Sequence, residues 1–275
     1  MGMAERTVFA GVDGSEPSIR AALWAADDAE RQRASLHLLH TYYTRGEQEH
    51  AENAVRRIAE QCRNAHPSLH VADEAVRGDA VDELIARPAW MLVVGSRGWG
   101  AIHDVLLGSV SAAVAAHAEQ PVVVVRGRIP SDTAEAAGPV VVGIGPESAR
   151  APAVRFAFAA ADRHGAELVA VQAVPPGYLL PGIASDPHRQ EVQQAAEERI
   201  TELLDDCHRQ HPHVVVRRVT SDQHPVDALR EHAETARLAV VGKRRRTTAR
   251  LGSTAFGTLH HAPCPVAVVP HDENG

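Results

Sequence analysis

This sequence has few cysteines, few aromatic residues and an excess of negative charge. Each of these features argues against a class of structure or binding partner. The three cysteines of the 275-residue chain, Cys62, Cys207 and Cys264, have neither a CxxC motif nor any other metal-ligand spacing, which argues against a zinc site or a disulfide framework. Aromatic residues make up only 4% of the chain, so the core must consist mainly of Val, Leu, Ile and Ala. The formal net charge of −7 argues against binding to nucleic acid or to an anionic membrane surface.

Long apolar segments are missing as well. No stretch approaches the roughly 18 consecutive apolar residues that a membrane-spanning helix needs. The first six residues lead directly into an apolar strand and do not have the features of a secretory signal peptide. Together with the reduced cysteines, these observations predict a cytoplasmic protein that binds neither membranes nor nucleic acid.

Two common phosphate-binding motifs and a metal centre are not indicated either. The chain contains no G-x4-G-K-[ST] motif, and Gly98-Trp99-Gly100 has His103 where a dinucleotide fingerprint requires a third glycine. Among the seventeen histidines, the best metal candidate combines Asp205, His208 and His211 near the end of one expected helix. Because Pro212 ends that helix and its surroundings are polar, we expect these side chains to lie on the surface without a metal.

An alternation of apolar strands and amphipathic helices is what the sequence does contain. Ser15 is expected to cap the first helix, with Pro17 in its first turn, where the missing N–H does no harm. Strands that are apolar throughout and alternate with helices predict an α/β fold with a parallel sheet buried on both faces. The strands expected in the first half are residues 7–12, 36–40, 69–76, 91–94 and 121–125, and the helices are 15–33, 47–65, 81–87 and 109–118.

The pattern then starts again, which indicates an internal repeat. The segment that begins Val140-Val141-Val142-Gly143 resembles the one that begins at Val8, and Gly252-Ser253 follows the second copy's glycine loop as Gly108-Ser109 follows the first. A repeat of this length predicts two domains, each large enough for a core of its own. The expected boundaries are domain 1 at residues 1–128, a linker at 129–138 and domain 2 at 139–275.

A glycine-rich loop after the fourth expected strand is the strongest functional feature of the sequence. Gly95 and Gly98 permit a tight turn, and Gly108-Ser109 places bare backbone N–H groups and a hydroxyl at the start of a helix. The macrodipole makes that end of the helix positive, so it suits a phosphate group. The alternative is a purely structural turn, but a turn does not require three spaced glycines and a serine.

An aspartate supports the phosphate interpretation. Asp13 follows the first strand and the Gly95 loop follows the fourth, and ligands of open parallel sheets bind beyond the carboxyl ends of the strands where the strand order switches. A carboxylate at this place can accept hydrogen bonds from ribose hydroxyls or from an adenine amino group. The alternative for Asp13 is a helix-capping aspartate.

These motifs resemble those of the universal stress protein family, in its ATP-binding, tandem form. The family pattern G-x2-G-x9-G-[ST] is present as Gly95, Gly98, Gly108 and Ser109, and Asp13 provides the family's aspartate after the first strand. The resemblance implies two Rossmann-like domains of the adenine nucleotide alpha hydrolase-like type. Each would have a five-stranded parallel sheet of order 3-2-1-4-5 flanked by helices.

The resemblance also implies which residues bind the nucleotide. The adenine and ribose would meet residues after the first two strands, and the phosphates would meet the glycine loop and the helix that follows it. The implied nucleotide-binding residues are Val12, Asp13, Gly14, Thr41, Val94, Gly95, Arg97, Gly98, Gly108, Ser109, Val110 and Ser111.

The second repeat departs from the family pattern. Gly145 stands where the first repeat has Asp13, Arg245 stands in place of Gly98, and the nine-residue spacer is reduced to six. We therefore predict a degenerate nucleotide site in domain 2. A second anion site there would use Gly242, Lys243, Arg245, Gly252, Ser253 and Thr254. The alternative is a solvated basic loop on a scaffold domain.

The implied function is an adenine-nucleotide-binding, nucleotide-dependent regulatory module of the stress response, with ATP, with or without Mg²⁺, as the ligand. Two alternatives stay open: a weak ATPase on the same fold, and a ligand-free structural dimeriser. Dedicated catalysis is not expected, because only Asp13 and Asp104 lie near the loop as carboxylates that could hold a metal. The last strands of the two domains, residues 121–125 and 265–269, are expected to pair within one chain as a pseudo-dimer, with a homodimer as a further association.

Overall fold

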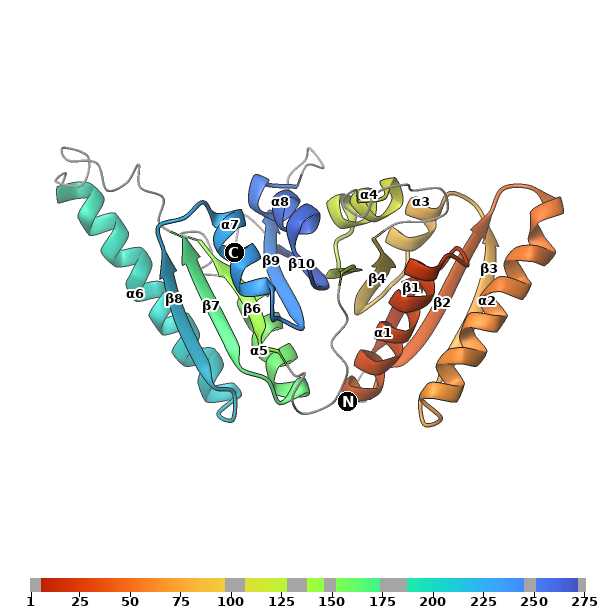
Figure 1. The fold of residues 1–275 in the computed structure, drawn as a ribbon, viewed down its shortest axis with the longest axis horizontal. Helices are drawn as coiled ribbons and strands as arrows, with labels where there is room; N and C mark the ends of the chain where they lie inside the picture. Colours follow the sequence, from red (N-terminus) through yellow and green to blue (C-terminus); the bar gives the residue numbers. More distant parts are fainter. Residues whose placement is uncertain are drawn as a thin grey trace. The chain divides into compact units, whose positions relative to one another are not determined.

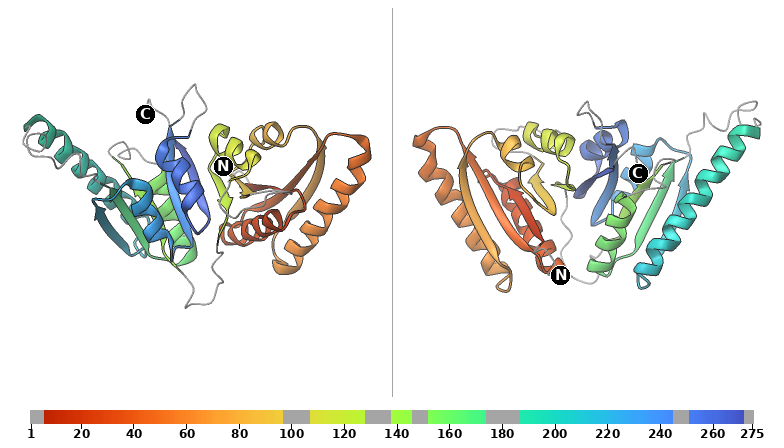
Figure 2. Two further views of the ribbon diagram at one scale, coloured as in Figure 1. Left: turned by 45° about the horizontal axis from the view of Figure 1, so that its top comes forward. Right: turned by 180° about the vertical axis from the view of Figure 1, so that it is seen from behind.

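A computed structural model of the chain describes residues 6–96, 107–127, 138–145, 152–173, 187–244 and 251–271. These residues form two compact units, one that contains the described residues up to 127 and one that contains those from 138 onward. Figure 1 shows that each unit consists of a parallel sheet flanked by helices, and Figure 2 gives two further views. The predicted α/β class with two Rossmann-like units is confirmed.

Unit 1 has the sheet order β3-β2-β1-β4-β5, with every described pair of neighbouring strands parallel. This is the 3-2-1-4-5 order that the family resemblance implied. The strands of unit 1 are β1 Thr7–Gly11, β2 Ser35–Tyr42, β3 Val71–Arg77, β4 Met91–Gly95 and β5 Val122–Val125. Its helices are α1 Glu16–Gln32, α2 Arg45–Ala65, α3 Ala80–Ile85 and α4 Ser109–His117.

Helices cover both faces of the unit 1 sheet. Helices α1 and α2 contact each other and the sheet, and α3 and α4 form a second contacting pair. Two strand-end glycines show that the pairs lie on opposite faces: a Cβ on Gly11 would meet Leu84 of α3, whereas a Cβ on Gly95 would meet Pro17 of α1. The strands are apolar throughout because both of their faces are buried.

Unit 2 repeats this architecture, with its own strands in the order β8-β7-β6-β9-β10. Counted within the unit, this is again 3-2-1-4-5. The strands of unit 2 are β6 Val140–Ile144, β7 Leu168–Ala173, β8 Val216–Ser221, β9 Leu238–Arg244 and β10 Val266–His271. Its helices are α5 Pro152–His164, α6 Pro187–Gln210, α7 Pro225–Ala233 and α8 Ser253–His261.

The three cysteines are free and buried. Burial raises the pKa of the Cys62 thiol to about 11, so the reactive thiolate is scarce at neutral pH. No helix in the described part of the chain combines the length and the apolar composition that a bilayer crossing requires. Among the same residues, no three His, Cys, Asp or Glu side chains gather into a group that suits a metal ion.

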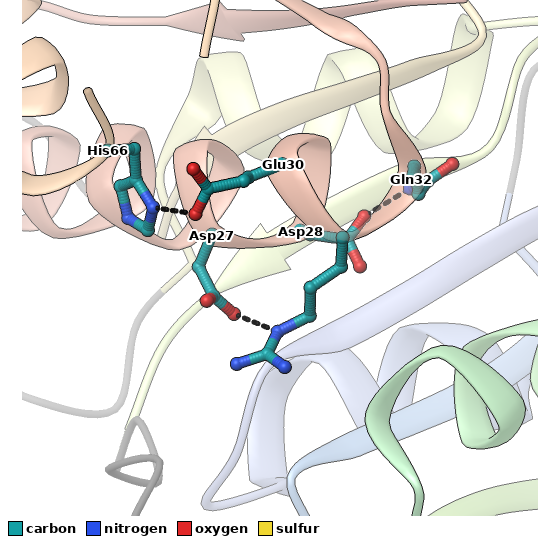
Figure 3. A network of polar contacts seen from close by, with 6 residues as sticks. Asp27, Asp28, Glu30, Gln32 and His66 are labelled. Carbon is teal, nitrogen blue, oxygen red and sulfur yellow. Dashed lines mark hydrogen bonds and ion pairs between the residues drawn. The ribbon is translucent and has the colours of Figure 1, made fainter. Parts of the chain in front are cut away.

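A pair of polar contacts fastens the end of α2 to α1. His66, which follows α2, lies 2.7 Å from the Glu30 carboxylate through its Nδ1, and Ser68 donates to the other oxygen of the same carboxylate. Figure 3 shows the contact between His66 and Glu30. It also shows the contacts of Asp27 with Arg31 and of Asp28 with Gln32 on the same helix. In unit 2, His211 makes the corresponding contact to Asp162, at 2.9 Å. Both units therefore have a histidine–carboxylate contact between their first two helices.

The Glu30 contact predicts a pH dependence of stability. The hydrogen bonds from Ser68 and His66 lower the pKa of Glu30 below its ordinary value of 4.5. A carboxyl group whose pKa is lowered by folding contributes stability above its unfolded pKa, and this contribution is lost as the pH falls through the folded value. We expect the stability difference between the wild type and Glu30→Gln to shrink as the pH falls below 4.5. Urea unfolding between about pH 6 and about pH 3 measures it.

The matched control is Glu52→Gln, which removes a half-buried carboxylate from α2. Its stability difference from the wild type should change less over the same pH range, because among the described residues Glu52 accepts a bond from Gln48 of its own helix and from no other element. A constant difference between the wild type and Glu30→Gln down to about pH 3 would contradict the prediction.

Candidate functional site

The turn between β1 and α1 is held by a closed set of hydrogen bonds around Asp13. Its Oδ1 accepts from the backbone N–H of Ser15 at 3.0 Å and from the Ser15 hydroxyl at 2.5 Å. The Asp13 N–H donates in turn to the Ser18 hydroxyl at 3.2 Å, and that hydroxyl donates to the Ser15 carbonyl at 2.9 Å. Gly14 has a φ of 82°, a conformation that favours glycine. The carboxylate is therefore oriented by the fold.

Ser15 caps α1, as the sequence predicted. Its side chain accepts from the N–H of Ser18 at 3.4 Å, and proline lies in the first turn. Asp13 is thus not the capping residue, but it accepts two hydrogen bonds from Ser15, which is. Ser18 was not predicted as part of the site, although its position three residues after a serine cap was the available signal.

The end of β4 approaches the start of α1 closely at Gly95. A Cβ at this position would lie 2.8 Å from the Pro17 carbonyl oxygen and 3.0 Å from the Ser18 nitrogen. Both are backbone atoms, so they cannot move aside as a flexible side chain would. Glycine at the first position of the loop is therefore required by the packing of β4 against α1.

Hydrogen bonds also join the two ends of the glycine loop. The Gly108 N–H donates to the Ser96 carbonyl at 2.7 Å, and the buried Ser111 hydroxyl donates to the Gly95 carbonyl at 2.6 Å. The backbone N–H of Ser96 donates to the Val125 carbonyl at 3.0 Å. These bonds fix where α4 begins relative to β4. The loop residues Arg97 and Gly98, which the sequence placed beside the phosphates, lie outside the described residues.

The start of α4 presents backbone donors. Gly108 is the N-cap residue in an extended conformation, and no side chain in the described part of the chain caps the helix there. Ser109 and Val110, the first two helical residues, are exposed. N–H groups of the first turn have no partner within a helix, and the macrodipole adds positive potential at this end. An anion placed here would meet donors that are already oriented.

The structure places most of the predicted site along one edge of the sheet. Strand β1 pairs with β4, with Gly11 opposite Val94, so Asp13 and Gly95 follow the ends of neighbouring strands. Strand β2 flanks β1 on its other side, and the Val12 N–H donates to the Leu39 carbonyl at 2.9 Å. The strand order switches between β2 and β4 around β1, which is where open α/β sheets bind ligands.

Thr41 differs from expectation in one respect. The sequence placed it just past a strand that ends at His40, but it lies within β2, opposite Val76 of β3. Pairing with β3 extends β2 by two residues, to Tyr42, beyond the apolar run that marked the strand in the sequence.

The corresponding edge of unit 2 is built differently. Strand β9 runs through Lys243, which pairs with Pro270 of β10, and the Lys243 side chain is buried. A solvated basic loop therefore does not describe Lys243, because the ladder with β10 extends the strand past Gly242. Arg245, the other basic residue of the predicted anion site, lies outside the described residues.

The close approach found at Gly95 is relaxed in unit 2. A Cβ on Gly242 would meet its nearest atom, Nδ1 of His271, at 3.4 Å, which is ordinary contact. Helix α8 still begins after an extended glycine, Gly252, and its first residues are Ser253 and Thr254. Unit 2 thus keeps the start of the helix but neither the aspartate nor the tight packing of unit 1.

Comparison with known proteins settles the family. The family model of the universal stress protein family matches residues 5–126 and again residues 137–270. The chain belongs to the universal stress protein family. Two consecutive matches confirm the tandem organisation that the internal repeat predicted.

Universal stress proteins of mycobacteria are similar to this one over nearly their whole length. Rv2005c of Mycobacterium tuberculosis is 33% identical, with 95% of this chain and 96% of the relative covered. A universal stress protein of Mycolicibacterium smegmatis is 31% identical, with 96% and 97% covered. The crystal structure of a universal stress protein from Archaeoglobus fulgidus has a TM-score of 0.69 at 19% identity over 96% of this chain and 98% of that one, which supports the fold.

Proposed function

We propose that this universal stress protein binds one adenine nucleotide, ATP with or without Mg²⁺, at the carboxyl edge of the unit 1 sheet. The observation that carries the proposal is the pairing of β1 with β4, which places the oriented Asp13 carboxylate and Gly95 at the ends of neighbouring strands, with Gly108 bonded to Ser96 beside them. A carboxylate suits ribose hydroxyls or an amino group, and helix-start N–H groups suit phosphate oxygens.

The assignment of residues follows from this arrangement and from the family resemblance. Val12, Asp13, Gly14 and Thr41 would contact the base and ribose, and Val94 and Gly95 the ribose and phosphates. The exposed start of α4 would hold the phosphates through Gly108, Ser109, Val110 and Ser111. The Ser111 hydroxyl already donates to Gly95, so its first contribution is to hold the loop end in place. Arg97 and Gly98 complete the assignment on the family pattern alone.

Identification of the bound nucleotide tests the proposal. Protein purified without added nucleotide and then denatured is expected to release an adenine nucleotide that mass spectrometry identifies. Calorimetric titration with ATP, AMP, cyclic AMP and adenosine follows, each with and without Mg²⁺. We expect ATP to bind at least about tenfold more tightly than adenosine, because charge-assisted bonds to phosphate are the stronger kind. No released nucleotide and no heat with ATP would favour the ligand-free dimeriser.

We further propose that nucleotide binding regulates this protein and that it is not a dedicated enzyme. Phosphate release from ATP separates this from the weak-ATPase alternative. Asp13→Ala and Asp104→Ala remove the two carboxylates that are expected near the loop, of which Asp104 lies outside the described residues. Turnover that survives in both variants would come from a contaminant, whereas turnover lost in either variant that still binds ATP would support the enzyme.

We also propose the following domain boundaries, strand pairing and location for the protein. Domain 1 covers residues 1–128, the linker 129–138 and domain 2 139–275, with a degenerate nucleotide site in domain 2. The last strands of the two domains pair as a pseudo-dimer within one chain, and two chains associate as a homodimer. The protein acts in the cytoplasm without a nucleic acid or membrane partner.

A further inference from the structure

A pocket in unit 2 lies apart from the residues assigned to the nucleotide. It has a volume of about 270 Å³ and lies between α6 and the neighbouring strands β6, β7 and β8. Figure 1 shows α6 alongside β8. The described residues that line it are Ile144, Ala170, Gln172, Glu197, Ile200, Thr201, Arg218, Val219 and Thr220.

The internal repeat shows why unit 2 has space here. Leu36 pairs with Val8 in the first strand of unit 1, and Leu168 pairs with Val140 in the first strand of unit 2, so Ala170 takes the place of Leu38. Leu38 is fully buried, and it is among the largest buried side chains of the molecule. The exchange of leucine for alanine removes the side-chain volume that fills this position in unit 1. Space therefore lies beneath α6 at the position that the Leu38 side chain occupies in unit 1.

Comparison of the two units also shows the origin of a positive charge at the pocket. Arg218 takes the place of Asp73, whose carboxylate is paired with Arg63 of α2 in unit 1. In unit 2 the Arg218 guanidinium donates to the Thr201 hydroxyl oxygen through both terminal nitrogens, at 3.1 and 3.2 Å. The Thr201 hydroxyl in turn donates a hydrogen bond to the Glu197 carbonyl oxygen at 2.8 Å. A helix-anchored hydroxyl thus orients the cation at the pocket wall.

The rest of the lining is divided between apolar and polar groups. Ala170, Ile144 and Ile200 are buried and form an apolar surface, whereas Gln172 and Thr220 add an amide and a hydroxyl. Polar groups make up the larger part of the exposed lining, and the apolar residues form its floor. The volume is below the roughly 300 Å³ at which sites for drug-sized ligands begin, so a nucleotide is too large.

We propose that this pocket binds a small monocarboxylate with an apolar body. The carboxylate would pair with Arg218, because a guanidinium presents its donors in a fork that matches two carboxylate oxygens. The apolar body would lie against Ala170, Ile144 and Ile200. Glu197 also lines the pocket, and its negative charge disfavours a dianion. The site does not depend on nucleotide binding in unit 1.

Pentanoate and pentanamide, which share a shape and differ in charge, are the probes for the full-length protein. Saturation-transfer NMR and calorimetry are expected to detect pentanoate and to show at least about tenfold weaker binding of pentanamide. Arg218→Gln should weaken pentanoate by a similar factor and leave pentanamide unchanged. Ala170→Leu, which restores the residue type of unit 1, should abolish binding of both.

Arg217→Gln is the matched control, because it removes the same charge from the next position of β8. Arg217 pairs with Glu167 and does not line the pocket, so pentanoate affinity should stay within about twofold of the wild type. The proposal would be overturned if pentanoate did not bind or if pentanoate and pentanamide bound equally well. It would also be overturned if the two arginine variants lost pentanoate affinity equally. Unchanged circular dichroism and thermal unfolding show that each variant is folded, and because neither measurement requires ATP, failure here is separate from failure of the nucleotide site.

Discussion

Replacing Ser109 with glutamate is expected to lower the affinity for ATP by at least about 100-fold without destabilising the fold. Ser109 is the exposed first residue of α4, where the proposal places the phosphates. A carboxylate there competes for the same N–H groups and repels phosphate. Two unit charges 4 Å apart near a protein surface interact by about 4 kcal/mol, and about 2.8 kcal/mol already corresponds to 100-fold.

The fold should tolerate this change because a negative charge in the first turn of a helix is favourable by about 0.3–1 kcal/mol. Calorimetric titration with ATP measures the affinity, and thermal unfolding without nucleotide measures the stability. Loss of binding together with retained or increased stability separates a ligand contact from a structural role.

Ser253→Glu is the matched control, since Ser253 is the first residue of α8 in unit 2. It introduces the same charge at the same point of the repeat, and ATP affinity should remain at the wild-type level. A loss in Ser253→Glu alone would move the site to unit 2, and wild-type affinity in both variants would show that helix α4 does not hold the phosphates.

Replacing Gly95 with alanine is expected to destabilise the protein by about 1–3 kcal/mol and to weaken nucleotide binding with it. The new Cβ would lie 2.8 Å from the Pro17 carbonyl oxygen, so β4 and α1 must separate. That movement would also disturb the Gly95 carbonyl, which accepts from Ser111, and the Asp13 turn, which depends on Ser18. Urea unfolding measures the stability, and ATP titration measures the affinity.

Gly242→Ala makes the same substitution at the equivalent strand end of unit 2. Its nearest neighbour would be the His271 ring at 3.4 Å, so we expect a change within about 0.5 kcal/mol. If the two alanine variants lose equal stability, the cost comes from glycine replacement in general and not from the approach of α1.

Features carried by local patterns could be predicted from the sequence. The uniformly apolar strands and the restart at Val140 sufficed for two parallel sheets, and Ser15 with Pro17 located the start of α1. The Gly95 loop could be predicted as more than a turn because its glycines recur at fixed spacing before a serine.

Features set by neighbouring elements could not be predicted in this way. Thr41 lies inside β2 because β3 extends the ladder, and Lys243 is buried in β9 because β10 does the same. The pocket beneath α6 was also hidden, since Ala170 is one apolar residue in an apolar strand. The repeat aligns it with the larger Leu38, but only the structure shows that a pocket lies at this position.

The hydrogen bonds that join Ser96 to Gly108 and Ser111 to Gly95 have a consequence for chain length. They bring the two ends of the glycine loop together, and the entropy of closing such a loop grows only slowly with its length, by about 0.6 kcal/mol per doubling. The fold therefore sets where the loop starts and ends, but it sets the number of residues between only weakly. The spacer has nine residues in unit 1 and six in unit 2, and this difference in length has little effect on the free energy of folding. Loop length at this edge can thus diverge between the two copies according to what each one binds.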